Sequence, residues 1–138
     1  MEVFAPAKLN LCLDIIARDQ SGYHEIQTVL TCTKSHQNRI EIFERTQKQN
    51  MGTPNSLAES AVHLTKSTHK IDKNIELKID RKIPFSSGLG GESSNAAAVL
   101  RGLNELWELG LDFDALRALG GRLGCDVPYF IEGGTALC

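Results

Sequence analysis

A glycine-rich segment at residues 83–99 (IPFSSGLGGESSNAAAV) constrains the fold of this chain more than any other feature. An alternating apolar stretch that starts at Ile75 precedes it, and its alanine-rich end predicts a helix that begins near Ser93 or Ser94. Glycines at a strand-to-helix turn allow positive φ angles and let backbone N–H groups approach a ligand closely. The free N–H groups and the positive dipole end of the helix then favour an anion, most naturally a phosphate.

The alternative interpretation of this segment is an ordinary turn in which a serine caps the helix. Three glycines in the four positions 88–91 are more than a cap requires, so we favour the phosphate site. Two common phosphate motifs do not fit. A Walker A loop ends in Gly-Lys-Ser/Thr, whereas Gly91 is followed by Glu92. A dinucleotide-binding loop needs a third glycine at the position that Ser93 occupies.

Length and composition limit the remaining classes of protein. The chain has 138 residues, 41% of them hydrophobic, which suits one domain with a buried core. A net charge of −2 gives no electrostatic reason to expect nucleic acid or an anionic membrane as a partner. No apolar run is long enough to span a membrane, and the cysteines follow no zinc or CxxC spacing, so we expect reduced thiols and a cytoplasmic location.

The first strand is predicted over residues 5–16, where apolar and polar residues alternate. Its core face would carry four apolar side chains, Leu9, Leu11, Leu13 and Ile15. Lys8 and Asn10 would project together from the opposite face. Spacing alone favours a solvated surface lysine over a functional one.

The remaining elements alternate between strands and helices. Strands are expected at 23–30, 39–44, 75–83 and from 133 onward, with a loop at 46–54. Ser56 and Glu59 have the capping-box spacing of a helix that ends near Thr68. A helix from Ser93 or Ser94 is expected to stop near Gly110, and a further helix would run from Asp112 or Asp114 to Gly124. This order predicts an α+β fold with helices on one side of a sheet.

Two other short motifs allow both a functional and a structural interpretation. Tyr23 and His24 follow a glycine and could form an aromatic platform for a ring, or simply pack at a strand edge. Asp126 precedes Val127 and Pro128, so it could be an N-cap whose following proline lies in a first helical turn. Taken alone, that cap is favoured over a catalytic aspartate.

The glycine loop resembles the phosphate loop of the GHMP kinases. Their pattern, Pro-x-x-x-Gly-Leu-Gly-Ser/Gly-x-Ser-Ser/Ala, is matched by Pro84, Gly88, Leu89, Gly90, Gly91, Ser93 and Ser94. Three further motifs, at residues 5–11, 22–26 and 124–136, occur in order and resemble those of one branch of this family. The resemblance implies the GHMP kinase N-terminal domain over residues 1–138, with a mixed sheet and helices packed on one side. It also implies a C-terminal domain that is absent here, and the end of the chain at Cys138, inside a predicted strand, suggests a fragment.

The resemblance places catalysis on Lys8 of the Pro-Ala-Lys motif and on Asp126 of Asp-Val-Pro. Phosphoryl transfer to an alcohol needs charge neutralisation on the phosphates and a base near the hydroxyl proton. Asp126 would accept that proton, and Lys8 would stabilise both the carboxylate and the developing alkoxide.

The resemblance also implies the ligands. ATP would bind with its triphosphate, neutralised by Mg²⁺, on Pro84, Ser86, Ser87, Gly88, Leu89, Gly90, Gly91, Glu92, Ser93 and Ser94. Its adenine would lie near the loop at 44–55, and no residue is assigned as a metal ligand. The 22–26 motif points to the branch of the family that phosphorylates a cytidyl diphospho-sugar alcohol in the non-mevalonate isoprenoid pathway. Asn10, Tyr23 and His24 would bind that small molecule, with the cytosine on the last two.

Two residues depart from the family pattern, because Glu92 replaces a usual glycine and Asn95 a usual aspartate. An acidic side chain beside a triphosphate should repel it unless it turns outward or helps hold Mg²⁺. We expect Glu92 to turn toward solvent. Two alternatives to the kinase remain, a nucleotide-binding fragment without turnover and a GHMP kinase for another small alcohol.

Overall fold

The computed structural model describes residues 1–18, 24–46 and 53–137. Its elements follow the order β1 (Glu2–Arg18), β2 (His24–Arg45), α1 (Leu57–His69), β3 (Asn74–Asp80), α2 (Gly91–Leu106), α3 (Phe113–Gly121), α4 (Val127–Glu132) and β4 (Thr135–Leu137). None of the helices in these ranges is both long and apolar enough to cross a membrane.

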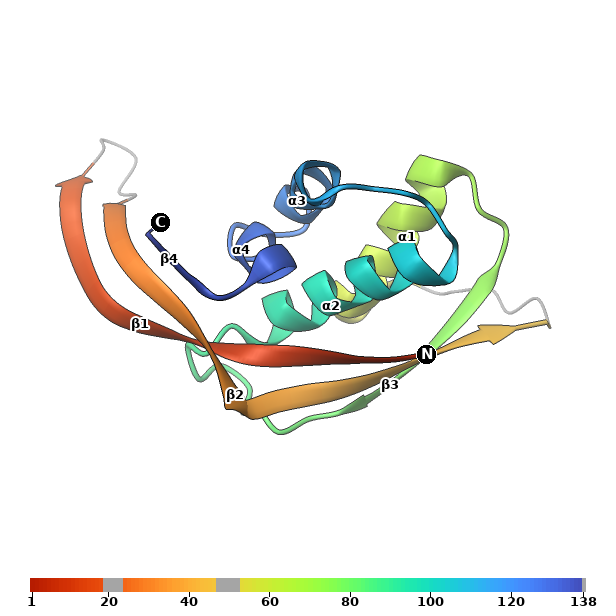
Figure 1. The fold of residues 1–138 in the computed structure, drawn as a ribbon, viewed down its shortest axis with the longest axis horizontal. Helices are drawn as coiled ribbons and strands as arrows, with labels where there is room; N and C mark the ends of the chain where they lie inside the picture. The colour runs from red at the N-terminus through yellow and green to blue at the C-terminus, as the bar shows by residue number, and fades with distance from the viewer. Residues whose placement is uncertain (19–23, 47–52, 138) are drawn as a thin grey trace.

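The sheet is built around β2, and all of its described pairings are antiparallel. β1 pairs along one edge of β2, while β3 and β4 take different parts of the other edge. The helices all lie on one side of this sheet (Figure 1). The predicted α+β architecture with helices on one face is therefore confirmed.

The long strand β2 joins two segments that the sequence predicted as separate strands, 23–30 and 39–44. The polar stretch between them looks like a connection in sequence. In the structure it remains in the strand because the register against β1 shifts there: Pro6 pairs with Gln37, whereas Ala7 pairs with Thr33. Residues 34–36 therefore have no partner in β1, and the strand absorbs them as a bulge.

The apolar face predicted for β1 is not a core face over most of its length. Leu9, Leu11, Leu13 and Ile15 are between 42% and 63% exposed. Ala5 and Ala7, nearer the start of the strand, are fully buried. The reason is coverage: β1 extends well past the start of α2, and the helices lie over its first half only (Figure 1).

Helix α2 packs between the sheet and the other helices, and its alanines make this close packing possible. Ala96, Ala97 and Ala98 are fully buried, as are Val99 and Leu103. The helix begins at Gly91 with Gly90 as its N-cap, earlier than the predicted Ser93 or Ser94, and it ends at Leu106 before Gly110. Gly90 adopts a left-handed conformation, so the backbone turns into the helix without a serine cap.

The other helix signals are largely confirmed. Ser56 caps α1, with its Oγ accepting a hydrogen bond from the Glu59 backbone N–H at 3.2 Å. Asp112, not Asp114, caps α3 through the Ala115 N–H at 2.8 Å. That helix ends at Gly121, before the predicted Gly124.

Candidate functional site

The glycine loop turns the chain from β3 into α2 through two glycines with positive φ angles, +75° at Gly88 and +69° at Gly90. The Ser94 N–H donates to the Gly90 carbonyl at 2.8 Å, and no side chain caps the helix. The first N–H groups of a helix have no partner within it. The start of α2 therefore offers backbone donors and positive dipole charge, as an anion site requires.

A cleft of about 280 Å³ opens beside this loop. Most of the residues expected to bind ATP line it, namely Pro84, Ser86, Ser87, Gly88, Gly90, Gly91, Glu92 and Ser93. Leu89 and Ser94 do not line the cleft. Leu89 contributes its carbonyl to the Lys8 backbone, and the Ser94 hydroxyl is buried without a hydrogen-bond partner in the described part of the chain.

Lys8 and Asp126 form an ion pair at the edge of the loop. The distance from Lys8 Nζ to Asp126 Oδ2 is 2.9 Å, and the side chains are 12% and 36% exposed. The Lys8 backbone N–H donates to the Leu89 carbonyl at 2.9 Å, which fixes β1 against the loop. A Cβ atom at Gly90 would lie 3.2 Å from Lys8 Cγ, so the ion pair and the glycine loop are direct neighbours.

Asp126 occupies the N-cap position of α4, but its side chain makes no capping hydrogen bond. The predicted N-cap position is therefore confirmed, but the carboxylate does not cap the helix and turns to Lys8 instead. Pro128 lies in the first turn of α4, as predicted, and its ring pre-organises that turn without a cap.

Arg101 links the elements that carry this ion pair. Its guanidinium donates to the carbonyls of Phe130 and Ile131 in α4 at 3.1 and 3.2 Å, and to that of Phe4 in β1 at 3.3 Å. Burial lowers the pKa of the Arg101 guanidinium from its ordinary value. The side chain thus ties α2 to the strand of Lys8 and to the helix of Asp126.

Two buried asparagines hold the entrance of the loop. The side-chain oxygen Oδ1 of Asn38 accepts from the backbone N–H groups of Lys82 and Ile83 at 2.8 and 2.9 Å. Its amide donates to Asn95 Oδ1 at 2.9 Å. Asn95, one of the departures from the family pattern, therefore connects α2 to Asn38 in β2. Through Asn38 it is also linked to the segment that follows β3.

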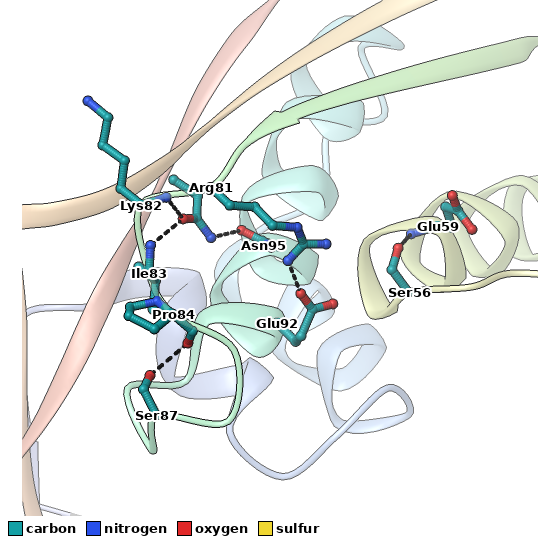
Figure 2. Close-up of polar contacts among 10 residues, drawn as sticks. Ser56, Glu59, Arg81, Lys82, Ile83, Pro84, Ser87, Glu92 and Asn95 are labelled. Atoms are coloured by element: carbon teal, nitrogen blue, oxygen red, sulfur yellow. Dashed lines mark hydrogen bonds and ion pairs between the residues drawn. The ribbon is translucent and has the colours of Figure 1, made fainter.

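Glu92, the other departure, does not simply turn to solvent as expected. Figure 2 shows the side chain of Arg81 reaching from the end of β3 to the Glu92 carboxylate, with which it forms an ion pair. The two side chains are 32% and 30% exposed. The Arg81 guanidinium also stacks on the Phe85 ring, with its Cζ 4.5 Å from the ring centroid.

The expected substrate residues are less well defined. Asn10 is exposed, two residues along β1 from Lys8. Tyr23 lies outside the described residues, and the same holds for the side chain of His24 and for residues 47–52 in the expected adenine loop. Among the described residues, no three His, Cys, Asp or Glu side chains gather as a metal-binding group.

Sequence reasoning missed three residues beside the cleft. Asn38 carried a usable signal, since it stands two positions before Ile40 on the buried face of a strand, where a polar residue needs a partner. Arg81 and Phe85 gave none, because an arginine after a strand and a phenylalanine in a loop are common surface features.

Comparison with known proteins identifies relatives over the whole chain. The model of the GHMP kinases N terminal domain matches residues 55–134. A 4-diphosphocytidyl-2-C-methyl-D-erythritol kinase from Geobacillus kaustophilus is 43% identical over 147 aligned residues, which cover 99% of this chain and 50% of that protein. The kinase of the same name from Bacillus cytotoxicus is 40% identical over 144 residues, with 98% and 50% covered.

A solved structure agrees with these relatives. The crystal structure of a 4-(cytidine 5'-diphospho)-2C-methyl-D-erythritol kinase matches with a TM-score of 0.84 and 33% identity, over 100% of this chain and 52% of that one. The chain spans about half the length of the curated relatives that it matches.

Proposed function

The chain belongs to the GHMP kinase family, and we propose that it is the ATP-binding half of a kinase that phosphorylates the 2-hydroxyl of 4-diphosphocytidyl-2-C-methyl-D-erythritol. The observation that carries this proposal is the Lys8–Asp126 ion pair, 2.9 Å long, directly beside an uncapped, glycine-rich helix start. The two curated relatives of that name match almost the whole chain, and the substrate in this proposal is the one in their name.

The geometry suggests how the residues divide the work. The backbone N–H groups at the start of α2 would bind the phosphates of ATP, where the helix dipole favours negative charge. Asp126 would accept the proton of the attacking hydroxyl, since its carboxylate is partly exposed and engaged by no cap. Lys8 would orient that carboxylate and stabilise the alkoxide that develops as the proton leaves.

Mg²⁺ would accompany ATP and neutralise charge on the phosphates. This ion usually keeps several waters and takes only one or two protein ligands, so a dedicated acidic cluster is not required. The Ser94 hydroxyl in the first turn of α2 has no hydrogen-bond partner among the described residues, but it is buried and does not line the cleft, so its side chain would have to rotate before it could bind the ion.

The proposal places the reaction in the cytoplasm and includes no nucleic-acid or membrane partner. Cys12, Cys32 and Cys125 are all free in the structure, which suits a reducing compartment. The net charge of −2 gives no attraction to polyanions.

Transfer of the γ-phosphate from ATP tests this function. The full-length enzyme is incubated with the cytidyl substrate, with mevalonate and with homoserine in parallel. Turnover of the first alone supports the proposal. Turnover of another alcohol would indicate a different GHMP kinase, and ATP binding without turnover of any would indicate a nucleotide-binding protein that is not a kinase.

A further inference from the structure

The Arg81–Glu92 ion pair occupies an unusual place for an acidic side chain. Glu92 is in the first turn of α2 and lines the cleft where the proposed function puts a triphosphate. A carboxylate there is favourable for an empty helix start, since it offsets the positive dipole end. The same carboxylate is unfavourable once a polyanion binds, because like charges repel strongly in a partly desolvated cleft.

Arg81 lies where its guanidinium can offset the negative charge of Glu92. It directly follows β3, its guanidinium pairs with Glu92, and its Cζ lies 4.5 Å from the centroid of the Phe85 ring. Phe85 is in the loop, so the arginine is held between the loop and the helix. Each side chain is about two-thirds buried, so the ion pair lies in the wall of the cleft and is not a solvated surface pair.

The neighbouring residue Lys82 shows that the pairing with Glu92 is specific to Arg81 and does not reflect a general cluster of positive charge. Figure 2 shows its side chain extending away from Glu92, while Arg81, its neighbour in sequence, points directly at it. The two cations are adjacent in the chain, but only Arg81 pairs with Glu92.

We propose that Arg81 is a positioning residue of the phosphate loop, whose guanidinium compensates Glu92 and so keeps the start of α2 receptive to a polyphosphate. The inference rests on the proposed nucleotide site. Arg81 acts through Glu92 and does not itself contact the phosphates. Replacing Arg81 alone therefore exposes a repulsive charge, whereas replacing both partners removes it.

A comparison of a single and a double variant tests this inference in the full-length enzyme, with ATP and inorganic tripolyphosphate as titrants. Arg81→Met keeps an unbranched apolar chain against Phe85 but leaves Glu92 uncompensated. We expect it to weaken binding of both titrants by about tenfold, and the loss should shrink as salt screens the repulsion. Arg81→Met/Glu92→Gln should return to within about threefold of the wild-type Kd. Lys82→Met, which removes a neighbouring positive charge, should leave the Kd within that same range.

The outcomes separate cleanly. If the double variant binds as weakly as Arg81→Met, the arginine contacts the phosphates directly and the inference is wrong. If Arg81→Met binds no more weakly than Lys82→Met, Glu92 needs no compensation, and the inference is wrong again. If the wild-type protein binds neither ATP nor tripolyphosphate, the proposed function fails and the inference fails with it.

Discussion

Lys8 and Asp126 meet at 2.9 Å although they come from opposite ends of the chain, one from β1 and the other from the start of α4. Their contact depends on two supports. The Lys8 backbone is bonded to Leu89 in the loop, and Arg101 ties α4 to β1 through three carbonyls. The ion pair is thus the point where the strand, the loop and the two helices are joined.

The first prediction concerns the proposed base. Asp126→Asn in the full-length enzyme should lower kcat by about 100-fold or more, because an amide cannot accept the hydroxyl proton. The Kd for ATP should change little, since the proposed phosphate site is formed by the start of α2 and not by Asp126. Steady-state kinetics and a nucleotide titration measure the two effects.

Asp114→Asn is the matched control, because it makes the same chemical change at a carboxylate that is 85% exposed and pairs with Arg117. It should leave kcat near the wild-type value. Near-normal turnover in Asp126→Asn would remove Asp126 from the mechanism.

The signals that could be interpreted correctly from the sequence are short-range ones. The glycine loop, the capping residue Ser56 and the proline in the first turn of α4 each act within a few residues, so spacing alone specifies them. The contact between Lys8 and Asp126 was available only through family resemblance. Alternation places Lys8 on a face of a strand, but it does not say what lies opposite that face.

Exposure was the least predictable property. Leu11 and Ile15 alternate as core residues do, yet each is 63% exposed because no described helix covers that part of β1. Periodicity reports which residues share a face, and coverage depends on the lengths of the other elements. The pairing of Glu92 with Arg81 was missed for a related reason, since it joins a helix start to a strand end across the cleft.

The second prediction concerns recognition of the cytidyl group. His24→Ala should raise the Kd for the cytidyl substrate by up to about tenfold, the size of a lost aromatic contact, and leave the Kd for ATP unchanged. His36→Ala is the control, because His36 is an exposed histidine of the same strand bonded to Ser35. Equal loss of both ligands in His24→Ala would mean that His24 supports the fold.

The third prediction concerns the buried amides at the loop entrance. Asn38→Ala removes the acceptor of two backbone N–H groups, those of Lys82 and Ile83, as well as the bond to Asn95. Each buried N–H group that loses its acceptor costs about 1–3 kcal/mol. Because two N–H groups lose theirs, the free energy of unfolding should fall by more than the loss of a single hydrogen bond would cause. Asn95→Ala removes only the bond between the two side chains and should cost less. Urea unfolding compares the variants, and a larger loss in Asn95→Ala would contradict this account.

The last prediction separates backbone strain from crowding at two loop glycines. Gly88 and Gly90 have similar positive φ angles, so alanine at either one costs about 1 kcal/mol of strain. A Cβ at Gly88 would meet nothing within 4 Å, whereas at Gly90 it would lie 2.8 Å from Phe130 Cζ and 3.2 Å from Lys8 Cγ. Gly90→Ala should therefore cost about 1–3 kcal/mol more in stability, as overpacking does, and it should lower kcat because Lys8 must move. Gly88→Ala should leave kcat close to the wild-type value. Urea unfolding and kinetics of both variants test this difference, and equal effects would show that Gly90 serves only the backbone turn and does not make room for Lys8.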